Sequence, residues 1–177
     1  MSVIKSFPTS GLTERNTQTI AEAIRSLYVS DTDFTDIFDV HEIEPYTDDD
    51  SGQSGYLFYI LRKDGVVYRT GRQYIKIYIE NNRYFISDFG YGTSMSLGFD
   101  INENITCYTI KNNSGIGFMI GDQIFDYFEA TESIDDSDNT IPILFRAHTS
   151  TTSSKLFTVF SANTPDSSQS LDDGFID

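Results

Sequence analysis

The stretch YIKIYIENNRYFISDFG, residues 74–90, decides the fold class. Its first half alternates isoleucine with Tyr, Lys and Glu, the period-two pattern of a strand with one buried face. A two-residue turn at Asn81-Asn82 folds the second half back as an antiparallel partner. In that register an opposite-charge pair and an aromatic pair share one face and an aliphatic pair lies on the other: Glu80 with Arg83, Tyr78 with Phe85, and Ile77 with Ile86. We therefore predict a β-hairpin with a defined register.

Short apolar segments separated by Gly, Asn, Asp and Ser continue on both sides of this hairpin. Turns are expected at Lys63-Asp64-Gly65 and at Gly121-Asp122, because glycine accepts the positive φ that tight hairpins require. The absence of helical patterns between these segments argues against a parallel nucleotide-binding sheet. Besides the two strands within residues 74–90, the predicted strands cover residues 56–62, 66–70, 101–111, 116–120, 123–129, 141–148 and 155–161.

One clear helix is predicted at residues 13–29, capped by Ser10 or Thr13, because its apolar residues recur at helical spacing. The fold prediction is mainly β: an antiparallel sheet or sandwich of about eight to nine strands with one N-terminal helix. The loop around Pro45 and the Asp48-Asp49-Asp50-Ser51-Gly52 run favours a boundary. We expect an N-terminal helix and acidic connector at 1–50, an antiparallel β domain at 51–161, and a Ser/Asp-rich tail at 162–177.

The chain has 177 residues with 27 acids and 12 bases, a net charge of −15, one Cys and no Trp. Such acidity argues against nucleic acid as a direct partner, because nucleic-acid affinity comes from Lys and Arg replacing counterions. Apolar runs are too short for a membrane span, and the polar residues after Met1 do not form the apolar segment of a cleaved signal peptide. We expect no membrane partner and no secretion by that route.

The charges are unevenly placed, so we expect a polarised molecule. Three explanations of the acidity stay open: solubility through self-repulsion, adaptation to salt, and an acidic face that binds a partner. Residues 31–50 contain nine acids and no Lys or Arg, whereas residues 62–83 contain six of the twelve bases. Basic side chains interleaved with tyrosines are able to bind an acidic or nucleic-acid strand by charge and stacking, or the acidic segments of a neighbouring copy. More often such residues are the solvated face of a sheet. The predicted partner-binding residues are Tyr68, Arg69, Tyr74, Lys76, Tyr78 and Arg83. The predicted acidic interaction face comprises Asp31, Asp33, Asp36, Asp39, Asp48, Asp49 and Asp50.

Catalytic and metal motifs are weak. Residues 31–42 place oxygen-bearing side chains at EF-hand spacing, but Asp36 stands where the glycine of the sharp turn belongs. Asp88-Phe89-Gly90 lacks the other motifs of a kinase. Cys107 falls in an alternating strand, where an inert buried thiol is expected, and the two histidines, His41 and His148, lie far from it in sequence. We expect no enzyme, no catalytic residues, no metal site and no cofactor.

Residues 74–90 resemble the strand, turn, strand, "Ile-Ser-Asp-x-Gly" signature of a family of uncharacterised domains found in bacteria, archaea and their viruses. The resemblance implies no activity. From the residues we expect a non-enzymatic structural or interaction subunit of a larger assembly, such as a phage virion or tail, located in the virion or in the cytoplasm of a prokaryotic cell. Its partners would be protein subunits of that assembly, copies of itself included. The alternative is an acidic inhibitor that imitates nucleic acid and occupies the basic groove of a host nuclease or defence protein.

Overall fold

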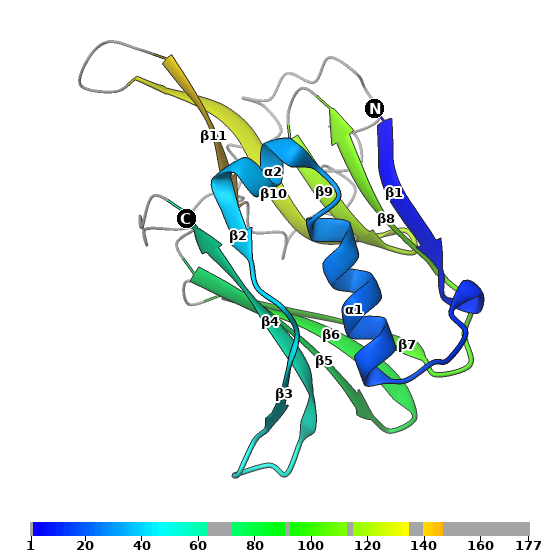
Figure 1. Cartoon of the computed structure of the whole chain (residues 1–177). Helices are drawn as coiled ribbons and strands as arrows, with labels where there is room; N and C mark the ends of the chain where they lie inside the picture. The colour runs from blue at the N-terminus through cyan, green and yellow to red at the C-terminus, as the bar shows by residue number, and fades with distance from the viewer. Residues whose placement is uncertain (1, 64–71, 91–92, 113–114, 135–139, 147–177) are drawn as a thin grey trace.

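The computed structural model describes residues 2–63, 72–90, 93–112, 115–134 and 140–146 (Figure 1). Two antiparallel sheets form a sandwich-like pair, and a helix lies between them. The mainly β, antiparallel prediction is confirmed. The helical elements are η1 (Thr9–Gly11), α1 (Thr17–Tyr28) and α2 (Thr32–Ile37). The strands are β1 (Ser2–Pro8), β2 (Phe38–Val40), β3 (Glu44–Thr47), β4 (Ser54–Arg62), β5 (Arg72–Glu80), β6 (Arg83–Gly90), β7 (Thr93–Asp100), β8 (Thr106–Asn112), β9 (Gly115–Ile120), β10 (Gln123–Ile134) and β11 (Thr140–Arg146).

Sheet A has five strands in the order β1-β8-β9-β10-β11. Its centre is the predicted hairpin of β9 and β10, closed by Gly121 at φ 61°. The first strand, β1, pairs with β8 about one hundred residues later in the chain, from Ser2 opposite Lys111 to Pro8 opposite Thr106. The N-terminal segment is therefore an edge strand of this sheet.

Sheet B has six strands in the order β2-β4-β5-β6-β7, with β3 also paired to β4. The β5–β6 hairpin has the predicted register, with Glu80 opposite Arg83 and Tyr78 opposite Phe85. Asn81 and Asn82 both take positive φ, 52° and 57°, as a primed two-residue turn requires. The turn and the period-two pattern thus select the same pairing.

Helix α1 begins later than predicted because its cap is Asn16, not Ser10 or Thr13. The Asn16 side chain accepts from the Thr19 N–H while the Thr19 hydroxyl accepts from the Asn16 N–H, a capping box. The helix then buries one stripe of side chains, which comprises Ile20, Ala21, Ile24, Leu27 and Tyr28. This stripe contacts β4 and β5 of sheet B and β1 and β8 of sheet A, so α1 joins the two sheets (Figure 1).

Tyr28 is the centre of the shared core and is fully buried. Its ring stacks on Phe118 of sheet A at 3.9 Å and meets Phe58 of sheet B edge-on at 5.6 Å. Its hydroxyl donates to the buried Asp126 Oδ2 at 3.0 Å. One tyrosine therefore connects both sheets through apolar contact and satisfies its polar end at the same time.

The structure corrects the number of elements. Sheets of five and six strands exceed the predicted eight or nine, and α2 is a second helix. The additional strands are β1, β2, β3 and β7, whose sequences are polar, short or rich in Ser and Gly. The core includes residues on both sides of position 50, since Phe34 and Phe38 pack with Phe128. The strands expected at 66–70 and 155–161 lie outside the described residues, as does the tail at 162–177.

Candidate interaction surface

The outer face of sheet B carries most of the predicted partner-binding residues. Because side chains alternate along β5, Ile75 and Ile77 enter the core while Tyr74, Lys76 and Tyr78 point to the other side. Both helices bury their apolar residues on the core side. We call this outer surface the tyrosine face and define it by Tyr46 of β3, Tyr59 of β4, Tyr74, Lys76 and Tyr78 of β5, and Phe85 of β6.

Aromatic rings stand side by side across the strands of the tyrosine face. Tyr59 lies opposite Tyr74 with ring centroids 5.8 Å apart, and Tyr78 stacks on Phe85 at 5.4 Å with an interplanar angle of 17°. The Lys76 ammonium lies 4.7 Å from the ring of Tyr46 and 5.7 Å from that of Tyr78. Cation–π attraction therefore holds the lysine among the rings.

Two glycines in the row of Tyr78 and Phe85 permit this arrangement. At Gly55 an added Cβ would lie 2.1 Å from the Ile77 carbonyl oxygen, and at Gly98 it would lie 2.9 Å from the Phe85 ring. Across this row the order is Tyr46, Gly55, Tyr78, Phe85, Gly98. The missing side chain of Gly98 gives the Phe85 ring room, and that of Gly55 lets β4 lie close to the main chain of β5.

Hydrogen bonds fix the hydroxyls of Tyr46 and Tyr78 on this face. Tyr46 donates to Gln53 Oε1 at 3.0 Å, and burial, supported by the nearby Tyr78 and Asp48, raises the Tyr46 pKa well above its usual range. Ser87 donates to the Tyr78 hydroxyl at 3.3 Å and also shares a short hydrogen bond with Ser96. The face is thus a preorganised surface of half-buried rings that stays uncharged at Tyr46 under physiological conditions.

Arg83 lies at one end of the same side of the sheet and pairs with Asp100 across the β6–β7 register at 3.2 Å. The structure therefore brings Tyr74, Lys76, Tyr78 and Arg83 to one side, as the alternation predicted. Tyr68 and Arg69 lie outside the described residues. Sequence reasoning missed Tyr46 and Tyr59 because they belong to other strands, although the alternation within 56–62 is a usable signal for Tyr59.

The acidic residues 31–50 lie on several elements. Asp31 caps α2 by accepting from the Phe34 N–H at 3.1 Å, and it also accepts from Lys111 Nζ at 3.1 Å. Lys111 binds Asp33 as well. Partial burial lowers the Lys111 pKa, but the hydrogen bonds with Asp33 and Asp31 outweigh it and leave this pKa raised. Two of the predicted acids are therefore joined to sheet A by one lysine.

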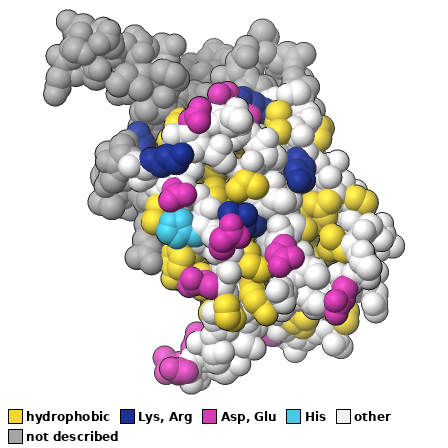
Figure 2. Space-filling view, in the orientation of Figure 1, with side chains coloured by type: hydrophobic (Ala, Val, Ile, Leu, Met, Phe, Trp, Pro, Cys, Tyr) yellow, Lys and Arg dark blue, Asp and Glu magenta, His cyan; other side chains and the backbone are white. Residues whose placement is uncertain are grey.

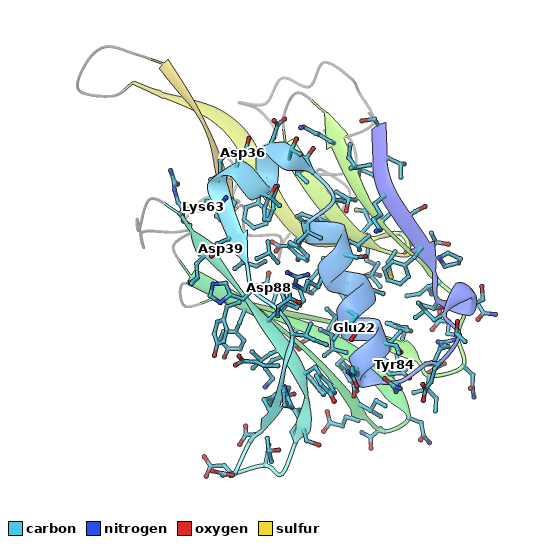
Figure 3. All side chains as sticks on the ribbon, in the orientation of Figure 1. Glu22, Asp36, Asp39, Lys63, Tyr84 and Asp88 are labelled. Atoms are coloured by element: carbon cyan, nitrogen blue, oxygen red, sulfur yellow. The ribbon has the colours of Figure 1, made fainter. Side chains whose placement is uncertain are left out.

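The other acids of this group are separated in space. Asp36 lies on α2 and Asp39 on β2 (Figure 3), where Asp39 is 3.4 Å from His41. Asp48, Asp49 and Asp50 occupy the β3–β4 turn, and the N–H groups of Ser51 and Asp50 lower the Asp48 pKa. Figure 2 shows acidic side chains spread over this side of the molecule with Lys and Arg among them. The acids form no single continuous patch in this view.

The calcium-like pattern does not assemble as a loop, because Asp31 and Asp33 face Lys111 and Glu42 pairs with Arg25 at 3.1 Å. Within the described ranges no group of three His, Cys, Asp or Glu is arranged to hold a metal ion. Cys107 is buried in β8, and that burial raises its pKa to about 12, as expected of an inert thiol. Asp88 lies on the inner side of β6 with the buried Tyr84 (Figure 3).

Comparisons with protein-family models, with curated proteins and with solved structures found no match to this chain. The resemblance of residues 74–90 to a family of uncharacterised domains stays a prediction. None of the helices in the described part of the chain is long and apolar enough to span a bilayer.

Proposed function

We propose that this chain is a non-enzymatic interaction subunit of a larger protein assembly, and that it contacts neighbouring subunits through the tyrosine face. This proposal rests on the placement of four tyrosines around Lys76 on one side of sheet B. Tyrosine is enriched at protein interfaces because its ring contributes apolar contact area while its hydroxyl forms hydrogen bonds with water or with a polar partner. A virion or phage tail is the assembly we propose.

The rigidity of the tyrosine face supports this proposal. The rings rest on a sheet whose inner side is packed with Ile75, Ile77 and Phe58, all completely buried. Contacts between rings and hydrogen bonds at Tyr46 and Tyr78 restrict the side chains before any partner arrives. Binding to such a surface costs little side-chain entropy. Lys76 and Arg83 favour a partner surface that presents carboxylates.

Native mass spectrometry of the chain mixed with the proteins encoded beside it tests the proposal. We expect a defined complex or a homo-oligomer, and we expect Tyr74→Ala with Lys76→Ala to weaken it by about 30-fold, the size of an interface hot spot. Tyr108→Ala in sheet A is the matched control and should leave the association unchanged. A stable monomer that binds none of these proteins, or a complex indifferent to the double substitution, would contradict the proposal.

A further inference from the structure

The edges of the two sheets differ in their protection against added strands. In β1 the register shifts between Val3 and Lys5, so this edge has a bulge and a lysine, and it ends at Pro8. The edge formed by β2 and β3 is short and contains Pro45. Bulges, lysines, prolines and short strands are the devices by which proteins prevent pairing at an edge. These two edges are therefore guarded.

Strand β7 is different. It is the last strand of sheet B, and all eight of its residues pair with β6 without a bulge, from Asp100 opposite Arg83 to Thr93 opposite Gly90. Its sequence TSMSLGFD contains no Lys, Arg or Pro. Among the described strands none pairs with its second side. A regular edge of this length, without the features that block pairing, is a template for a further strand.

The direction of the main-chain groups of β7 follows from one hydrogen bond. The Asp100 N–H donates to Glu103 Oε2 at 3.0 Å, so at this position the N–H points away from β6. In an antiparallel ladder the pointing direction repeats every second residue. The N–H and C=O groups of Gly98 and Ser96 consequently point to the open side as well. A partner strand would meet two donors and two acceptors there.

A cleft of about 250 Å³ runs along this edge. One wall is β7 and the other is the turn between β9 and β10, with the segment after β7 between them. Four consecutive residues of β7 line the cleft, which corresponds to roughly 13 Å of strand. The lining combines apolar side chains with two carboxylates and comprises Ser96, Leu97, Gly98, Phe99, Glu103, Ile105, Ile120, Gly121, Asp122 and Gln123.

We propose that the β7 edge captures an extended segment of a partner protein as an added strand of sheet B. Main-chain hydrogen bonds to Ser96 and Gly98 provide the pairing, and the apolar lining receives alternate side chains of the segment. Glu103 and Asp122 are the charged groups of the lining, so the segment carries a Lys or Arg that faces them. This site adjoins the tyrosine face where Gly98 lies opposite Phe85, but it uses main-chain groups of the edge and does not depend on the function proposed for that face.

Titration of the ¹⁵N-labelled chain with two blocked decapeptides tests the inference. Both peptides alternate Thr and Val, and they differ only in a central Lys or Glu. We expect the Lys peptide to shift the amide resonances of Ser96 and Gly98, to slow their hydrogen exchange, and to bind at least tenfold more tightly than the Glu peptide. Absence of binding, equal affinities, or shifts centred on β1 or on the tyrosine face would overturn the inference.

Separate experiments test the role of the two carboxylates and that of the main-chain hydrogen bonds. In the variant Glu103→Gln with Asp122→Asn, the Lys and Glu peptides should bind alike, while the glutamine still accepts from the Asp100 N–H and preserves the local fold. Two further Lys peptides carry N-methyl groups on every second residue. One peptide is methylated at the odd positions and the other at the even positions. One of these peptides should lose binding and the other should keep it, because only every second N–H group of an added strand faces β7. Equal binding of these two peptides would exclude strand addition. Tyr74→Ala should not alter any of these affinities.

Discussion

Replacing Tyr28 by Phe removes one hydroxyl from the middle of the core and leaves the ring in place. The stacking on Phe118 at 3.9 Å and the edge contact with Phe58 are retained, so the loss comes from the hydrogen bond to Asp126 Oδ2. Tyr28 and Asp126 are 0% and 1% exposed, so water does not replace the missing donor. Removing one partner of a buried hydrogen bond costs about 1–3 kcal/mol. We expect the free energy of unfolding to fall by about 2 kcal/mol.

Urea denaturation followed by circular dichroism measures this loss. With an m-value of about 2.5 kcal/mol/M, a loss of about 2 kcal/mol lowers the midpoint by about 0.8 M. Tyr84→Phe is the matched control, because Tyr84 is also a buried tyrosine, on the inner side of sheet B, and its hydroxyl makes no hydrogen bond within the part of the chain that the structure describes. It should change the stability by less than about 0.5 kcal/mol. If both substitutions cost the same, Tyr28 does not act through Asp126.

Three further predictions concern the sheets and their connections. Gly55→Ala should destabilise the protein by about 3 kcal/mol in the same urea assay, because its Cβ would lie 2.1 Å from the Ile77 carbonyl oxygen; a loss below about 1 kcal/mol would mean that the strands separate easily. Lys111→Met should cost about 1 kcal/mol near neutral pH through the ion pairs with Asp31 and Asp33. The Lys111 pKa is raised in the folded protein. The stability that Lys111 contributes is therefore complete at pH values below its unfolded pKa of about 10.4, and it disappears as the pH rises through its folded pKa. A stability difference between wild type and variant that does not depend on pH would refute the ion-pair explanation. Cys107, with a pKa raised to about 12 by burial, should react with a thiol reagent at pH 8 only as fast as the chain unfolds, and labelling of the native protein within seconds would contradict its placement in the core.

The part of the fold that sequence predicts best is local. The register of β5 and β6 follows from Asn81-Asn82 together with the alternation on either side, and all of this information lies within residues 74–90. The same reasoning places Tyr74, Lys76 and Tyr78 on one face. Neighbouring strands in a hairpin need no long-range information to find their register.

What sequence reasoning could not supply depends on partners far along the chain. Strand β1 is exposed at nearly every position, including Val3 at 57%, so its pattern shows no buried face. It is a strand because β8 offers an edge. Likewise β7 contains Gly98, which a strand pattern disfavours, but the Phe85 ring of the adjacent strand occupies the space of the missing side chain. Tyr46 joins the tyrosine face only through the pairing of β3 with β4.

The polar contacts between α1 and the two sheets bear on which surfaces recognise a partner. Polar groups connect the elements to each other. Inside the core Tyr28 binds Asp126 and the Thr109 hydroxyl donates to the Leu27 carbonyl at 2.9 Å, and at its rim Arg25 donates to the carbonyls of Val40 and His41. These contacts hold α1 between the two sheets and fix the distance between them. Sheet B is thereby supported from within along β4 and β5, the strands that α1 contacts most. A sheet supported on its inner face presents its outer rings and its β7 edge in fixed positions, and these are the two features through which we propose that the protein meets its partners.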